Sequence, residues 1–206
     1  MIRDVKNICV SIRGVTPFIM HNVAAADPQN QWSIKMAPIK NKRKKTESDH
    51  LELRDLSFLS CLYWANDLNG LYLPTDNIRK MLLESGRSLD QKGAKKQVVG
   101  ISFPEYLGFP FKTKNRSDME ALKNDPQIRY FKIVTIGRER VPSVRAIFSD
   151  WGADILVEID TSIINVGTVE SWFEYAGSRI GLGCRRPYGP TPGEFGRFVV
   201  DEFKEI

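Results

Sequence analysis

GSRIGLGCRRPYGPTPGEFGRF, residues 177–198, is the most informative stretch of this 206-residue chain. It holds six glycines, three prolines and four arginines in 22 residues. Glycine lets a backbone turn sharply and lets another backbone approach closely. Arginine binds phosphate through two parallel N–H groups and stacks on flat bases. The stretch therefore predicts a loop that holds a strand of nucleic acid, with the rest of the chain as its scaffold.

The composition indicates a globular protein without a membrane segment. A hydrophobic share of 42% is ordinary, and 206 residues fit one domain with insertions or two small ones. There is no run of 18 apolar residues, and the N-terminus lacks the apolar core of a signal peptide. Cys9, Cys61 and Cys184 have neither a zinc spacing nor a disulfide pattern. We expect a cytoplasmic protein with no metal, no cofactor and no membrane partner.

Hydrophobic periodicity places the main elements. Residues 7–14 alternate as a strand with Ile8, Val10 and Ile12 on one face. Spacings of three and four predict helices at 51–67 and 76–85, and β-rich runs predict strands at 128–136 and 153–159. A further helix is expected to be capped by Thr168 and to end at Gly177. A last strand is expected at 195–200.

The order of these elements matches βαββαβ. It predicts an α+β, ferredoxin-like (RRM-like) domain over residues 1–206, with an antiparallel sheet and a long insertion after the first strand. Two helices would cover one face of the sheet. The other face would then be free, as in RNA-recognition domains.

The insertion, at about residues 20–50, is basic. Lys35 to Lys45 holds six cations and no acid, so we expect a mobile, exposed loop that does not enter the core. It is either a solvated linker or an arm that orders on phosphate. The net charge of +5 and the other basic clusters favour the arm.

The candidate nucleic-acid contacts are basic side chains outside the apolar stripes, with one aromatic side chain that can stack a base. Three further arginines, at 138, 140 and 145, follow the strand at 128–136. The expected contacts are Arg13, Lys40, Lys42, Arg43, Lys44, Lys45, Lys95, Lys96, Arg179, Arg185, Arg186, Tyr188 and Arg197.

Catalytic chemistry has little support in the sequence. His21 and His50 are the only histidines, and acid/base catalysis needs a partner group within reach. The GLG of residues 181–183 follows a helix and precedes a strand, the reverse of a dinucleotide-binding turn. We expect a protein that is not an enzyme, with His21 and Asp27 as the catalytic candidates otherwise.

Two stretches resemble a known superfamily. IGLGCRRPYGPTPGEFGRFVVDEF (180–203) resembles the glycine-rich loop and last strand of the repeat-associated RNA-binding (RAMP) superfamily, which supplies backbone and crRNA-processing subunits of CRISPR effectors. LYLPTDNIRKMLLESGR (71–87) resembles its strand–proline–helix segment. A family of phage-encoded proteins is more similar still. It shares the Thr-Pro…Met-His pattern of residues 16–21, a lysine-rich segment and the FGRF ending of residues 195–198.

The resemblance implies single-stranded RNA or DNA binding with little sequence preference, and several copies along one strand in a prokaryotic or phage-infected cell. Subunits that cut RNA carry an aspartate in a glycine-rich loop, but the segment around Asp27 lacks the glycines. Processing subunits often carry a histidine near the first helix, and His21 follows the first strand. The alternatives are therefore a metal-independent endoribonuclease using His21 and a phage decoy or inhibitor of a CRISPR effector.

Overall fold

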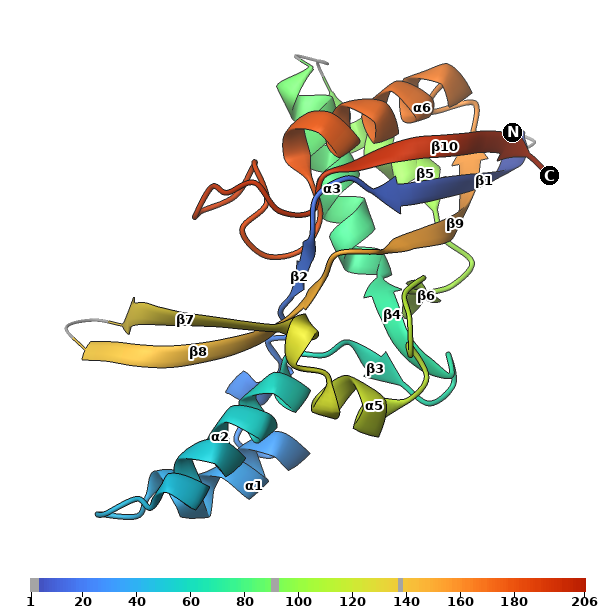
Figure 1. Cartoon of the computed structure of the whole chain (residues 1–206). Coiled ribbons are helices and arrows are strands. Elements are labelled where there is room, and N and C mark those ends of the chain that lie inside the picture. Colours follow the sequence, from blue (N-terminus) through green and yellow to red (C-terminus); the bar gives the residue numbers. More distant parts are fainter. Residues whose placement is uncertain (1–3, 90–92, 137–138) are drawn as a thin grey trace.

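The computed structural model describes residues 4–89, 93–136 and 139–206, with side chains outside 134–142. The chain is an α+β protein built on antiparallel sheets (Figure 1). Two pairs of elements project from its body, namely the β7–β8 hairpin and the helices α1 and α2. In the described part of the chain, no helix combines the length and apolar character needed to cross a bilayer.

The body contains a four-stranded sheet with the strand order β10–β1–β9–β5. Its strands are β1 (Val5–Gly14), β5 (Ile101–Ser102), β9 (Gly152–Asp160) and β10 (Phe198–Glu205). The alternation predicted for the first strand is confirmed, because Ile8, Val10 and Ile12 are buried. Each lies opposite a buried residue of the antiparallel strand β9: Val157, Ile155 and Ala153.

Helices α3 (Thr75–Ser88) and α6 (Val166–Tyr175) bury their apolar stripes in the same core as this sheet. Ile78, Met81 and Leu82 of α3 are fully buried, as are Trp172 and Phe173 of α6. The helix predicted at 76–85 is confirmed and extends by one residue at its start and three at its end.

The boundaries predicted for the last helix are wrong. Asn165, rather than Thr168, caps α6, because its side chain accepts a hydrogen bond from the Gly167 N–H. The chain also does not leave the helix at Gly177. It continues through a π-helical turn, η4 (Ala176–Ile180), to Gly181. Gly177 serves close packing instead, since a Cβ there would lie 2.3 Å from the carbonyl oxygen of Phe198.

Two smaller antiparallel sheets complete the strand arrangement. One has the order β2–β8–β7, from β2 (Phe18–Met20), β7 (Arg129–Ile136) and β8 (Glu139–Phe148). The other has the order β3–β4–β6, from β3 (Trp64–Ala65), β4 (Gly70–Pro74) and β6 (Gly108–Pro110). Short helices occupy the connections: η1 (Ala24–Ala26), α4 (Ala94–Gln97), η2 (Val98–Gly100), α5 (Met119–Asn124) and η3 (Pro126–Ile128).

The basic insertion is a pair of helices and not an irregular loop, which corrects the prediction. Helices α1 (Gln31–Lys40) and α2 (Glu47–Ser60) are joined by a short basic turn. Thr46 and Asp49 form a capping box at the start of α2. The Lys42 ammonium donates to the Asp49 carboxylate over 2.5 Å, and this bond, together with hydrogen bonds from Thr46, lowers the pKa of Asp49 to about 2. The predicted helix at 51–67 exists, shifted to 47–60.

Gly86 allows α3 and α6 to approach each other. A Cβ at this position would lie 2.5 Å from Cζ2 of Trp172, which is fully buried. The indole ring therefore occupies the space that a side chain at position 86 would need.

We expect Gly86→Val to lower the free energy of unfolding by ~1–3 kcal/mol, the usual range for overpacking a core. Urea denaturation measures this. The matched control is Ser88→Val, because Ser88 is exposed on the same helix and the change there should stay within ~0.5 kcal/mol. Equal effects of the two variants would contradict the packing described.

Candidate nucleic-acid interface

The glycine-rich loop lies along the segment that joins β1 to β2. The Cys184 N–H donates to the Ile19 carbonyl over 2.9 Å, and the Gly196 N–H donates to the Pro17 carbonyl over 2.8 Å. The Val15 N–H donates to the Arg197 carbonyl over 2.8 Å. Backbone hydrogen bonds therefore hold residues 14–22 against the glycine-rich loop, the two regions that resemble the phage-encoded family.

Two glycines make this contact possible. Gly196 has φ +74°, and a Cβ there would lie 1.8 Å from the Leu182 carbonyl oxygen. Gly183 has φ +78°, and a Cβ there would lie 2.7 Å from the Ile19 carbonyl oxygen. Positive φ and close backbone approach both select glycine. The glycine content thus shapes the loop and holds it against β2.

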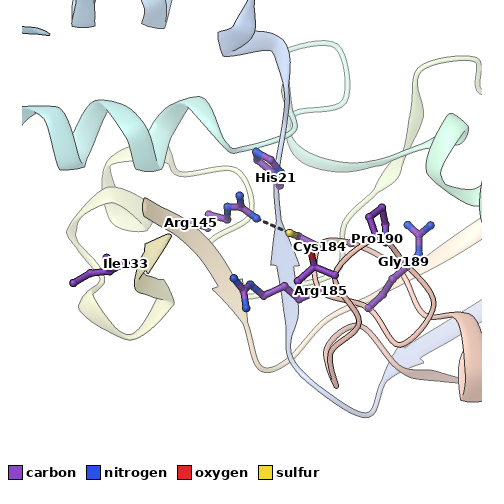
Figure 2. Close-up of a pocket in the computed structure, with 10 residues that line it drawn as sticks. His21, Ile133, Arg145, Cys184, Arg185, Gly189 and Pro190 are labelled. Atoms are coloured by element: carbon purple, nitrogen blue, oxygen red, sulfur yellow. Dashed lines mark hydrogen bonds between the residues drawn. The ribbon is translucent and has the colours of Figure 1, made fainter. Parts of the chain in front are cut away.

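A cleft of about 660 Å³ separates the loop from the β7–β8 hairpin. Figure 2 shows its walls, with His21 after β2 at one side, Arg145 of β8 facing Cys184, and Arg185 on the loop. The remaining lining residues come from β7 and the loop: Ile133, Gly183, Arg186, Gly189, Pro190 and Thr191. None of these lining residues is acidic.

Two arginines give the cleft its charge. The guanidinium of Arg145 lies in the wall against Sγ of Cys184 (Figure 2). Arg185 has φ +57°, and within the described part of the chain its side chain has no hydrogen-bond or ion-pair partner. Both groups can therefore receive an anion without first breaking an ion pair.

His21 supplies an uncharged polar group in the same cleft. Burial of the half-buried ring lowers the pKa of His21 below its usual 6.5, and the nearby Arg145 cation lowers it further. The imidazole is therefore neutral at pH 7. The hydroxyl of Tyr63 donates to the His21 carbonyl over 2.8 Å and fixes the backbone there.

Several predicted phosphate contacts are held in bonds within the protein. Arg186 binds the Glu84 carboxylate over 2.8 Å and donates to the Tyr188 carbonyl. Arg197 pairs with Glu194, and Arg13 binds Asp201 through two nitrogens. Lys42 pairs with Asp49, and Lys45 donates to the carbonyls of Lys40 and Lys42. Of these, only Arg186 lines the cleft.

The other predicted contacts are exposed but scattered. Lys40, Arg43 and Lys44 lie at the turn of the α1–α2 pair, Lys95 and Lys96 on α4, and Arg179 on η4. Tyr188 lies on the loop and is 48% exposed. Asp27 accepts a bond from the Gln29 N–H in a turn after η1. Of the described residues, no three His, Cys, Asp or Glu side chains gather as metal ligands would.

Sequence reasoning did not commit to Arg145, although it noted the arginines at 138, 140 and 145. Arg145 reaches the cleft because Ala146, the next residue of β8, pairs with Met20 beside His21, and no local pattern in the sequence predicts this pairing. Arg138 lies outside the described residues, and so does the side chain of Arg140. Phe131 and Ile133 of β7 were also missed, and they are 50% and 60% exposed.

The open face of the main sheet does not provide the surface expected by analogy with RNA-recognition domains. Asp154 lies at its centre and accepts bonds from Ser11 over 2.7 Å and from Lys112 over 2.5 Å. Glu158 and Glu202 also lie on this face, opposite Asn7 and Ser11 of β1. Carboxylates repel a polyanion and offer no stacking surface, so the cleft is the better candidate.

Comparison with models of protein families and with curated proteins finds no match to this chain. The case for a function therefore depends on the cleft and on the chemistry of the side chains that line it.

We expect Arg186→Ala to lower the free energy of unfolding by about 2–4 kcal/mol, because it leaves the Glu84 carboxylate without its cation. The Arg186 and Glu84 side chains are only 16% and 12% exposed. The neighbouring Arg185→Ala should change stability by less than ~0.5 kcal/mol. Chemical denaturation of the two variants decides the matter, and a small loss for Arg186→Ala would show that this pair does not hold the loop.

Proposed function

We propose that the protein binds single-stranded nucleic acid in the cleft between the glycine-rich loop and the β7–β8 hairpin. The observation that carries the proposal is the pair Arg145 and Arg185, which face a cleft without an acidic lining residue. Arginine binds phosphate oxygens with two N–H groups at once. Such contacts depend on the backbone and carry little base information, so low sequence preference follows.

The size and the apolar lining of the cleft support a single strand. About 660 Å³ lies within the range of sites that enclose a small ligand, and a double helix is too wide to enter it. The exposed apolar side chain of Ile133 lies in the lining together with the arginines. Tyr188 lies on the facing loop. Unstacked bases gain ~1–3 kcal/mol each from aromatic stacking.

We infer a ferredoxin-like βαββαβ unit for the main sheet. The strand order β10–β1–β9–β5 supports it, with α3 between β1 and β5 in the chain and α6 between β9 and β10. This unit supports the proposed relation to the RAMP superfamily, and the contact between residues 14–22 and 177–198 supports the proposed relation to the phage-encoded family. The β7–β8 hairpin and the α1–α2 pair are additions to the unit.

We further propose that the protein acts in the cytoplasm and that several copies line one strand. Cys9, Cys61 and Cys184 are free, which suits a reducing compartment. Ile133 of β7 lines the cleft and is 60% exposed, which leaves apolar surface there. Sizing of complexes formed on strands of increasing length would detect coating by several copies.

We expect affinity for a labelled single strand to fall by ~10³-fold or more between 50 mM and 200 mM salt if six or more phosphates are contacted. Arg185→Ala should weaken binding and lower the salt slope by about one, because one phosphate contact is lost. Lys204→Ala is the control. It removes the same charge from the open sheet face, where Lys204 lies opposite Cys9, and should leave affinity unchanged.

Binding that does not depend on salt, or equal effects of Arg185→Ala and Lys204→Ala, would contradict the proposed site. Parallel titrations with RNA, DNA and duplex of matched length identify the preferred strand, and tighter binding of the duplex would also count against it.

We expect labelled RNA to stay intact in the presence of the protein, because His21 has no acidic partner within the described residues. Gel electrophoresis after incubation in a metal chelator tests this. Cleavage by the wild type that His21→Ala abolishes would instead establish the metal-independent endoribonuclease.

A further inference from the structure

A second, smaller cavity lies on the other side of His21 and Arg145. Its volume is about 230 Å³, it opens to solvent, and residues of η1, α2 and β8 line it. His21 and Arg145 line both cavities, so the two spaces share a wall. The smaller space falls below the ~300–1,000 Å³ of sites for drug-sized ligands, and therefore suits a group smaller than a nucleotide.

Small side chains create this space. Ala25 and Ala26 of η1 line one side, and Ser57 and Ser60 of α2 line another. The rim is fixed by Asn22, whose side-chain amide donates to the Leu62 carbonyl over 3.1 Å and whose amide oxygen accepts from the Ala24 N–H over 2.9 Å. The Asn22 side chain thus ties η1 to the end of α2 at the edge of the cavity.

Polar groups with unused hydrogen-bonding capacity lie at the wall. Within the described part of the chain, the His21 imidazole and the Ser143 hydroxyl have no hydrogen-bond partner. Each can donate or accept a bond, so each suits the edge of a neutral base of any kind. A planar imidazole or guanidinium is also a surface on which unstacked bases rest.

We propose that the smaller cavity is a nucleobase pocket, which takes one base turned out of a strand whose backbone lies in the larger cleft. This inference rests on the proposed function. Arg145, in the shared wall, would hold the phosphate beside the turned-out base, while His21 and Ser143 would contact the base itself. Since His21 and Ser143 can each donate or accept a hydrogen bond, the pocket would take different bases, which agrees with low sequence preference.

The test fills the smaller cavity and leaves the larger cleft unchanged. Ala26 is exposed and lines only the smaller cavity, so Ala26→Phe would place a ring in the space. The matched control is Ala24→Phe, an exposed position on the same short helix that lines neither cavity. Circular dichroism and urea unfolding would confirm that both variants fold like the wild type.

Two probes separate base contacts from phosphate contacts. One is an oligothymidylate strand, and the other is a strand of equal length made of abasic sugar phosphates. We expect Ala26→Phe to weaken oligothymidylate binding about tenfold, in line with the loss of one stacked base. Binding of the abasic strand should stay the same, and Ala24→Phe should change neither.

If Ala26→Phe and Ala24→Phe bind oligothymidylate equally well, the proposed base pocket is wrong. A loss that is equal for both probes would also contradict it, because the cavity would then affect the backbone and not a base. Arg185→Ala separates this failure from failure of the proposed function. Arg185→Ala should weaken the binding of both probes. If it weakens the binding of neither, the proposed nucleic-acid site itself is wrong.

Discussion

Close backbone contact between the glycine-rich loop and the segment from β1 to β2 is the constraint on which the site depends. Hydrogen bonds at Val15, Pro17 and Ile19 fix the two stretches together. The contact places His21, at the end of one stretch, beside Cys184 and Arg185 of the other. Since β2 also pairs with β8, the same constraint brings Arg145 to the opposite wall. A cleft with fixed cations follows from this backbone arrangement.

The distribution of charge over the surface distinguishes the cleft from the open face of the main sheet. On the open face of the main sheet, cations and carboxylates neutralise one another in pairs such as Lys112–Asp154 and Arg13–Asp201. At the turn of the α1–α2 pair, Asp49 neutralises Lys42, whereas Lys40, Arg43 and Lys44 are exposed. The cleft lining differs from the sheet face because Arg145 and Arg185 lie in it without a carboxylate. A polyanion in the cleft would be attracted by both guanidinium groups, whereas on the sheet face the neighbouring carboxylates would offset the attraction of the cations.

Local patterns in the sequence predict much of the fold. The alternation around Val10 and Ile155, and the stripes on α3 and α6, are strong because each element buries one face in the core. Helix α1 was missed because it contains Pro38 and buries only Met36 and Ile39. Pairs such as Arg186 with Glu84, 102 residues apart, are set by tertiary packing and leave no local signal. The sequence therefore draws attention to the loop but cannot separate Arg186, which pairs with Glu84, from Arg185, which has no partner within the described residues.

Photochemical crosslinking of the bound strand tests the central claim most directly. A single strand that carries 5-iodouracil would be irradiated with the protein, and the crosslinked peptides identified by mass spectrometry. A strand in the cleft predicts crosslinks to peptides that contain His21 or Tyr188. Crosslinks confined to the open sheet face, in the peptides of Cys9 and Leu156, would contradict the account.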